Sequence, residues 1–356
     1  MRERERFSAP HPAPVLSQSI NASDPATASM TTILYSTPDN PMPGNPVAGY
    51  FDGAGHRKIR YAVFKSKAAN IRGTIVLLQG RNESIEKYFE TIGELMEAGF
   101  WVATFDWRGQ GGSERLLPQS GRGHVERFDD YERDLTAFLH EIVLPDTRLP
   151  FSIVAHSMGA LVALSLAPFL ASRIERMVLL APFVGLSGQV VGERGAVTIA
   201  TSLRRFGFGS LPLRADRGKH LPFENNVLTT DSRRYARNLA LIDACPRLRV
   251  GPPTARWLSE AFRTIRHVME REHLTRITVP TVILAPTADR LVPYLAIEYL
   301  ASNFRAGHLI PIDGGRHELL HEADRYRAQA MAAILAFLPG ADPDDDGPVL
   351  RHLEET

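Results

Sequence analysis

Apolar residues in this sequence gather either in short continuous runs or in longer stretches with helical spacing. Short runs that can be buried on both faces of a parallel sheet predict strands, and the stretches between them predict covering helices. The expected strands are residues 58–64, 73–79, 100–105, a run beginning at Phe151, 176–181, 281–285 and 309–312. The expected helices lie between Asn82, which can cap the first of them, and Gly99, at 130–144, up to Leu170, at 293–302 and at 318–338.

The alternation of strands and helices predicts an α/β fold, with a mostly parallel central sheet flanked by helices on both faces. Ligands are then expected beyond the carboxyl ends of the strands. The alternation stops between Pro182 and Val279, where glycine and proline clusters and short helical stretches replace it. We interpret residues 183–279 as a helical lid inserted between core strands, and residues 47–182 and 280–338 as the core.

The two ends of the chain lack the apolar pattern of the core. Residues 1–46 contain RERER and many prolines, so we expect a disordered segment and no signal peptide. A start of translation at Met30 is an alternative to Met1, because the stretch from Met30 leads directly into the folded part. Residues 339–356 carry DPDDDG and are expected to form a solvated acidic tail.

Composition narrows the class of protein further. The 356 residues include 41 basic and 40 acidic side chains, a balance that argues against a nucleic-acid partner. The single cysteine, Cys245, excludes an internal disulfide framework, and no run of about 18 apolar residues is present to span a bilayer. We expect a cytoplasmic protein, with peripheral contact at the inner membrane surface as an open alternative.

The strongest local motif is a serine between a strand and a helix. The pattern Ala155-His156-Ser157-Met158-Gly159 is the sequence form of a nucleophile elbow, which exposes a serine oxygen on a strained turn. Side chains beyond Cβ at Ala155 and Gly159 would collide where the helix passes the strand, so both flanks must be small. Taken alone, the five residues also fit an ordinary turn with a chance serine.

Several separated blocks together resemble a known family. They are QGRNESIEKY, DWRGQGGS, RGHVERFDDYERDL, AHSMGA, APTADRLVP and GGRHEL. In this order they resemble the α/β-hydrolase superfamily and, within it, the branch of monoacylglycerol lipases and bacterial lysophospholipases. The resemblance extends roughly from Tyr50 to Leu338 and implies the α/β-hydrolase fold. The lid region matches the branch weakly.

A serine hydroxyl needs a base to take its proton, and the base needs an acid that holds its other ring nitrogen. The chain order Ser157, Asp289, His317 fits this fold, and the resemblance places the acid and the base at these positions. His308, His321 and Asp313 lie nearby and are alternatives. His308 begins a strand and His321 falls inside a helix, so both are less suited to a pocket mouth. We expect His156 to have a structural role.

An oxyanion intermediate needs two backbone N–H donors, which in this fold follow the nucleophile and the second long strand. These are Met158 and Arg81. The side chain of Arg81 is left open between an anionic headgroup and solvent. We expect no cofactor, and no metal is required, because no cluster of His, Cys, Asp and Glu has metal-ligand spacing.

The lid region is basic and apolar. Between Ser187 and His273 there are 15 Lys or Arg against 8 Asp or Glu, a balance of 15 minus 8, or +7. Apolar residues, among them Leu203, Phe206 and Phe208, are interleaved with them. This composition suits contact with an anionic membrane surface, for which Arg204 and Arg205 are candidates, but it equally fits a solvated arginine-rich lid.

We therefore predict a serine hydrolase that cleaves carboxylic esters of lipid-like substrates, of the lysophospholipase or monoacylglycerol lipase type, through an acyl-enzyme. A small-ester esterase, an acyltransferase or an amino-terminal peptidase would use the same residues. A catalytically silent lipid- or protein-binding module is the alternative of another class, and the complete set of serine, acid and base argues against it.

Overall fold

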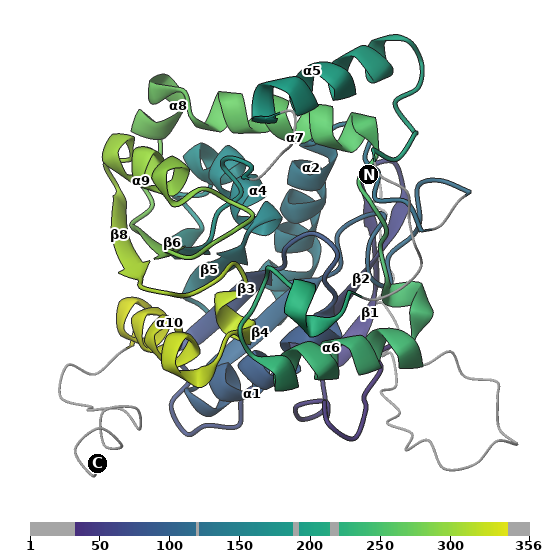
Figure 1. Ribbon diagram of the computed structural model, residues 1–356. Coiled ribbons are helices and arrows are strands. Elements are labelled where there is room, and N and C mark those ends of the chain that lie inside the picture. The colour runs from purple at the N-terminus through teal and green to yellow at the C-terminus, as the bar shows by residue number, and fades with distance from the viewer. Residues whose placement is uncertain (1–32, 119–120, 188–191, 214–220, 341–356) are drawn as a thin grey trace, which may run out of the picture. The chain divides into compact units, whose positions relative to one another are not determined.

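The computed structural model describes residues 33–118, 121–187, 192–213 and 221–340 (Figure 1). Its central element is an eight-stranded sheet with the order β1-β2-β4-β3-β5-β6-β7-β8. The strands are β1 (Val47–Gly53), β2 (Arg57–Phe64), β3 (Gly73–Leu78), β4 (Phe100–Phe105), β5 (Phe151–His156), β6 (Ile174–Leu180), β7 (Thr281–Pro286) and β8 (Gly307–Ile312). From β4 to β8 every neighbouring pair is parallel, whereas β1 and β2 form an antiparallel edge.

The central strands have the burial that their apolar runs predict. Every residue of β3, β5 and β7 is buried, as expected of a parallel sheet covered on both faces. Strand β1 was not predicted. Its sequence, VAGYFDG, contains two glycines and has no clear alternation of apolar and polar residues. The segment is a strand because all seven of its residues pair with β2.

Ten α-helices lie in the described part of the chain. They are α1 (Phe89–Glu97), α2 (Asp129–Phe138), α3 (Leu144–Asp146), α4 (Met158–Leu166), α5 (Gly192–Arg205), α6 (Ser232–Ala244), α7 (Ala255–Val268), α8 (Arg271–Thr275), α9 (Tyr294–Asn303) and α10 (Asp324–Phe337). Helices α1 and α10 bury their apolar residues in one core cluster, and α2, α4, α7 and α9 bury theirs in another. The two clusters correspond to the two faces of the sheet.

The predicted insertion between β6 and β7 is helical, and its described residues contain no strand. Helices α5 and α7 pack against each other, and α7 also packs on α4. Helix α6 lies elsewhere, beside α1, where Arg234 forms an ion pair with Glu90 at 2.6 Å (Figure 1). The insertion therefore extends over two regions of the core, and its role as a lid stays a prediction.

The prediction of a disordered segment over residues 1–46 is wrong for residues 33–46. Leu34 is 8% exposed, the guanidinium of Arg60 donates to the carbonyl of Ile33, and the amide of Asn40 donates to the carbonyl of Glu86. These few anchors tie a proline-rich stretch to the core, and composition does not reveal them. Residues 1–32, and residues 341–356 of the predicted acidic tail, lie outside the described residues.

The contact between α6 and α1 should weaken in acid. Burial alone would raise the pKa of Glu90, but the hydrogen bond from Arg234 and the charges of Arg327 and Arg237 lower it to about 2. A carboxylate with a lowered pKa contributes stability that is complete above its unfolded value of 4.5 and is lost as the pH falls toward 2. Wild type should therefore exceed Glu90→Gln in unfolding free energy at pH 6, and the difference should shrink toward pH 3. Chemical denaturation across this range measures it; a difference independent of pH would contradict the prediction.

Candidate active site

Ser157 stands at the turn between β5 and α4 with a backbone that few residues adopt. Its φ is 50° and its ψ is −112°. The turn is held on both sides, because the Ser157 N–H donates to the carbonyl of Leu180 at 3.0 Å and its carbonyl accepts from Phe183 at 3.1 Å. Strain of this kind persists only where the surroundings fix it, and it is common at functional sites.

The small flanks of the elbow have the steric reason that the motif predicts. A Cβ atom added to Gly159 would lie 2.6 Å from the carbonyl oxygens of both Leu78 and Gln79. Ala155 is completely buried. The start of α4 thus passes directly over the end of β3, which brings the loop after β3 beside the serine.

The structure brings Ser157, Asp289 and His317 together. They follow β5, β7 and β8 respectively, so all three lie at the carboxyl ends of parallel strands. His317 Nδ1 lies 2.7 Å from Asp289 Oδ2, and His317 Nε2 lies 2.9 Å from Ser157 Oγ. The side chains of Asp289 and His317 are almost wholly buried, at 0% and 3% exposed.

These contacts determine which ring nitrogen of His317 carries the proton. Asp289 also accepts from the backbone N–H groups of Leu291 and Val292. Burial alone would raise the pKa of Asp289, but the adjacent His317 and these donors lower it, so the carboxylate is ionised. An ionised carboxylate only accepts, so Nδ1 of His317 carries a proton and Nε2 presents its lone pair to the serine hydroxyl.

The alternative residues lie outside this chain of hydrogen bonds. His308 is exposed on β8. His321 is buried, and neither of its ring nitrogens has a hydrogen-bond partner among the described residues. Asp313 accepts from the hydroxyl of Thr287 at 2.9 Å and so links the loops after β7 and β8.

The loop after β3 holds the candidate oxyanion donor Arg81. The N–H groups on either side are fixed, since Gly80 donates to Glu83 and Asn82 donates to Gln110 Oε1 at 2.7 Å. The second candidate, Met158, opens α4, where N–H groups have no partner within the helix. That the backbone N–H groups of Arg81 and Met158 point toward a substrate oxygen remains a prediction.

Two side chains of this loop connect it to the insertion. The guanidinium of Arg81 donates to the carbonyl of Gly251 and lies over the ring of Trp257, 5.3 Å from its centroid. Asn82 does not cap the following helix as predicted. It has a positive φ of 62°, and its Oδ1 accepts from the N–H of Val250 at 2.8 Å. The insertion thus determines how these two polar side chains are used, which the local sequence does not show.

Behind the serine lies a buried polar network that sequence reasoning missed. Glu83 accepts from Tyr88 at 2.7 Å and pairs with Lys87 at 2.7 Å, and Lys87 also pairs with Glu318 at 2.7 Å. His156, next to the nucleophile, joins the network through Glu83. The only sign of this network in the sequence is the spacing of Glu83 and Lys87, which are four residues apart and can form an ion pair. Such pairs usually lie on exposed helix surfaces, so the spacing does not indicate a buried network.

His156 connects this network to the proposed base. Its Nδ1 lies 3.1 Å from Glu83 Oε2, and its Nε2 lies 3.1 Å from the carbonyl oxygen of His317. Both neighbours are acceptors, so both ring nitrogens carry protons and His156 is an imidazolium. Its charge, with that of Lys87, balances the carboxylates of Glu83 and Glu318. His156 therefore holds the His317 loop through the backbone carbonyl, whereas Asp289 holds the imidazole ring.

We predict that His156→Ala destabilises the fold by about 3–5 kcal/mol, because it leaves one negative charge of the buried network unbalanced and the His317 carbonyl without its donor. Burial alone would lower the pKa of His156, but Glu83 raises it above 6.5. A raised pKa contributes stability that is complete below pH 6.5 and is lost as the pH rises through the folded value. Denaturation of wild type and variant at pH 6 and pH 10 should show a smaller difference at pH 10. The exposed control, His308→Ala, should match wild type, and equal stability of all three proteins would refute the role.

The described residues contain neither a metal-ligand cluster nor a membrane-spanning helix. No group of three or more His, Cys, Asp or Glu side chains is placed to hold a metal ion. None of the described helices has the length and apolar character required to cross a membrane.

Comparison with known proteins places the chain in a family. Residues 69–324 match the model of the family described as serine aminopeptidase, S33. Lysophospholipase L2 of Escherichia coli strain K12 is 33% identical over 298 residues, which cover 81% of this chain and 86% of that protein. A probable lysophospholipase L2 of Haemophilus influenzae is 27% identical over 293 residues, covering 81% and 91% respectively.

Solved structures show the same fold. A soluble variant of monoglyceride lipase from Saccharomyces cerevisiae, in complex with a substrate analog, aligns with a TM-score of 0.67 at 19% identity, covering 84% of this chain and 98% of that one. A monoacylglycerol lipase of Paleococcus ferrophilus aligns with a TM-score of 0.62 at 21% identity, covering 79% and 98%. The predicted α/β-hydrolase fold is confirmed, and the chain belongs to the serine aminopeptidase S33 family of α/β-hydrolases.

Proposed function

We propose that this protein is a serine hydrolase that cleaves carboxylic esters of lipid-like substrates through an acyl-enzyme. Ser157 Oγ attacks the acyl carbonyl while His317 Nε2 takes the hydroxyl proton, and the N–H groups of Arg81 and Met158 stabilise the oxyanion. His317 then gives the proton to the leaving alcohol. A water molecule, activated by the same histidine, releases the acid and restores Ser157.

One observation carries the proposal: the continuous hydrogen-bonded line from Ser157 through His317 to the buried Asp289. A binding module has no need of a strained serine aligned with an imidazole and an ionised carboxylate. Lipid esters are favoured as substrates because relatives named lysophospholipase L2 cover most of the chain.

The family description makes amino-terminal peptidase activity the second candidate. An aminopeptidase needs negative charge near the serine to receive the substrate's ammonium group. The two carboxylates of the network behind Ser157, Glu83 and Glu318, are buried and already pair with Lys87 and His156. They do not offer this charge, which favours the ester substrate.

A substrate screen separates these candidates. It compares p-nitrophenyl acetate, butyrate and octanoate with lysophosphatidylcholine, a monoacylglycerol and leucine p-nitroanilide. We expect fatty acid release from at least one of the two lipids and no cleavage of the anilide. Cleavage of the anilide without lipid hydrolysis would support the peptidase instead, and activity confined to the acetate would support a small-ester esterase. Transfer of the acyl group to added glycerol would reveal an acyltransferase.

A further inference from the structure

Two neighbouring side chains join the loop after β3, which carries the proposed oxyanion donor, to residues 250–257 of the insertion. The guanidinium of Arg81 donates to the carbonyl of Gly251, and Oδ1 of Asn82 accepts from the N–H of Val250 at 2.8 Å. The loop thus presents one donor and one acceptor to one acceptor and one donor of two consecutive residues. Because both bonds depend on the same register, a shift of the loop along the 250–257 segment breaks both of them.

The 250–257 segment is itself held in place and can support the loop. The carbonyl of Pro252 accepts from the N–H of Gly123 at 3.2 Å, and the carbonyl of Gly123 accepts from the N–H of Thr254 at 2.9 Å. The hydroxyl of Thr254 accepts from the N–H of Trp257 at 3.2 Å and caps the start of α7. Trp257 is 3% exposed, and its ring lies against the guanidinium of Arg81. The segment therefore connects the loop to a helix that is packed in the core.

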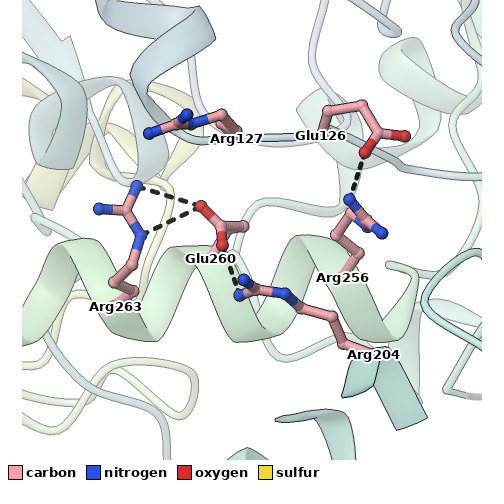
Figure 2. Close-up of a pocket in the computed structure, with 6 residues that line it drawn as sticks. All are labelled: Glu126, Arg127, Arg204, Arg256, Glu260 and Arg263. Carbon is pink, nitrogen blue, oxygen red and sulfur yellow. Dashed lines mark hydrogen bonds and ion pairs between the residues drawn. The ribbon is translucent and has the colours of Figure 1, made fainter. Parts of the chain in front are cut away.

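Ion pairs hold a second face of α7, which carries Arg256, Glu260 and Arg263 at helical spacing (Figure 2). The carboxylate of Glu260 is 4% exposed and pairs with Arg263 at 3.1 Å and with Arg204 of α5 at 2.6 Å. Arg256 pairs with Glu126, on the segment before α2. A shift of α7 would break these pairs and leave the buried carboxylate of Glu260 alone, so the helix is a rigid support.

On the core side, the same loop is held through its backbone. The N–H of Gly80 donates to Glu83, and the N–H of Asn82 donates to Gln110 Oε1 at 2.7 Å. The peptide that carries the N–H of Arg81 lies between these two fixed peptides. Asn82 has a φ of 62°, a left-handed conformation that a residue with a side chain adopts only at a cost in free energy. The contact of its side chain with the insertion stabilises this conformation and so the shape of the loop.

We propose that the side chains of Arg81 and Asn82 are positioning groups, which are anchored on the 250–257 segment and direct the N–H of Arg81 toward the oxyanion. An oxyanion donor accelerates the reaction most when its direction is fixed before the charge develops. Because this charge exists in the transition state and not in the bound ester, loss of the anchors lowers kcat and leaves KM almost unchanged. The inference rests on the proposed function, and it makes the insertion a part of the catalytic apparatus.

The test is the double variant Arg81→Met with Asn82→Gly, assayed on p-nitrophenyl butyrate. It keeps every peptide N–H, and glycine adopts the positive φ of position 82 readily, but both side-chain contacts with the insertion are lost. We expect kcat to fall about tenfold, less than the roughly 10²–10³-fold loss for a donor removed outright, with KM within about twofold of wild type. The ester is neutral, so the lost positive charge cannot act through substrate binding.

Two further double variants separate misdirection of the donor from loss of stability. Arg81→Lys with Asn82→Asp keeps a donor and an acceptor for the same two partners, so kcat should return to within about threefold of wild type. The matched control is Arg305→Met with Asn303→Gly, the same two changes at the end of α9, where Asn303 donates to the carbonyl of Tyr299. It should hydrolyse the ester like wild type. Asn82→Gly alone should show a smaller loss of kcat at unchanged KM, and it serves if the first double variant does not fold.

Inhibition by butylboronic acid measures the oxyanion contact itself. The boronate forms a tetrahedral adduct on the serine, with an oxygen in the oxyanion position, so its inhibition constant should rise in the Met/Gly variant by about the factor by which kcat falls. Unchanged kcat, a rise in KM alone, equal loss in the Lys/Asp variant or an unchanged inhibition constant would overturn the inference while leaving the proposed catalysis intact. If wild type cleaved no ester at all, the proposed function would fail first, and the inference with it.

Discussion

Replacing Ser157 by alanine should lower kcat for ester hydrolysis by at least about 10³-fold while leaving the fold intact. The hydroxyl is the only proposed nucleophile, whereas the strained turn around it is fixed by backbone hydrogen bonds to Leu180 and Phe183. Steady-state hydrolysis of p-nitrophenyl butyrate measures the loss. Because the strain is held by the backbone, the alanine variant should unfold at a similar denaturant concentration.

A nearby serine provides the matched control. Ser165 lies on α4 and donates to the carboxylate of Glu132, away from the proposed base. Ser165→Ala should keep near-normal kcat. If Ser157→Ala retained more than a few per cent of wild-type turnover, or if Ser165→Ala lost as much, the nucleophile would have to be reassigned.

The second large effect concerns the partners of Ser157. His317→Ala and Asp289→Asn should each lower kcat by about 10³-fold or more. The alanine removes the base, and the asparagine can donate to Nδ1, which favours the wrong tautomer of His317. Combined with Ser157→Ala, either change should add little, because the three residues act as one unit. Kinetics of the single and double variants measure this lack of additivity.

The neighbouring histidines are the controls for this prediction. His308→Ala should remain active, because His308 is exposed on β8 and outside the hydrogen-bonded line. His321→Ala should also turn over substrate. The variant should be less stable than wild type, because the His321 ring is buried against Tyr88. An inactive His308→Ala beside an active His317→Ala would mean that the base is misassigned.

The sequence predicted the parts of the fold whose signals are local. Continuous apolar runs marked β3, β5 and β7 because burial on both faces demands them, and the elbow needed only small residues at fixed spacing. Strand β1 escaped prediction, since two glycines interrupt it and pairing with β2 alone makes it a strand. Residues 33–46 looked disordered because their anchors, such as Leu34, are few.

The candidate site was predictable to a similar extent and for similar reasons. Chain order and the residues after each strand pointed to Ser157, Asp289 and His317, which the structure places within hydrogen-bonding distance. The network behind them was not predictable. Glu83 and Glu318 are 235 positions apart in the sequence, and only the fold reveals that Lys87 pairs with both of them. The position of Asn82 before a predicted helix likewise suggested a helix cap. Its side chain instead accepts a hydrogen bond from the N–H of Val250, which is distant in the sequence.

The most direct test of the account is to trap the activated serine. Wild type, Ser157→Ala and His317→Ala are incubated with a fluorophosphonate, digested and mapped by mass spectrometry. The account predicts one adduct per wild-type chain, on the peptide that contains Ser157, much slower labelling of His317→Ala and no adduct on Ser157→Ala. An adduct on another serine, or stoichiometric labelling of the alanine variant, would contradict it.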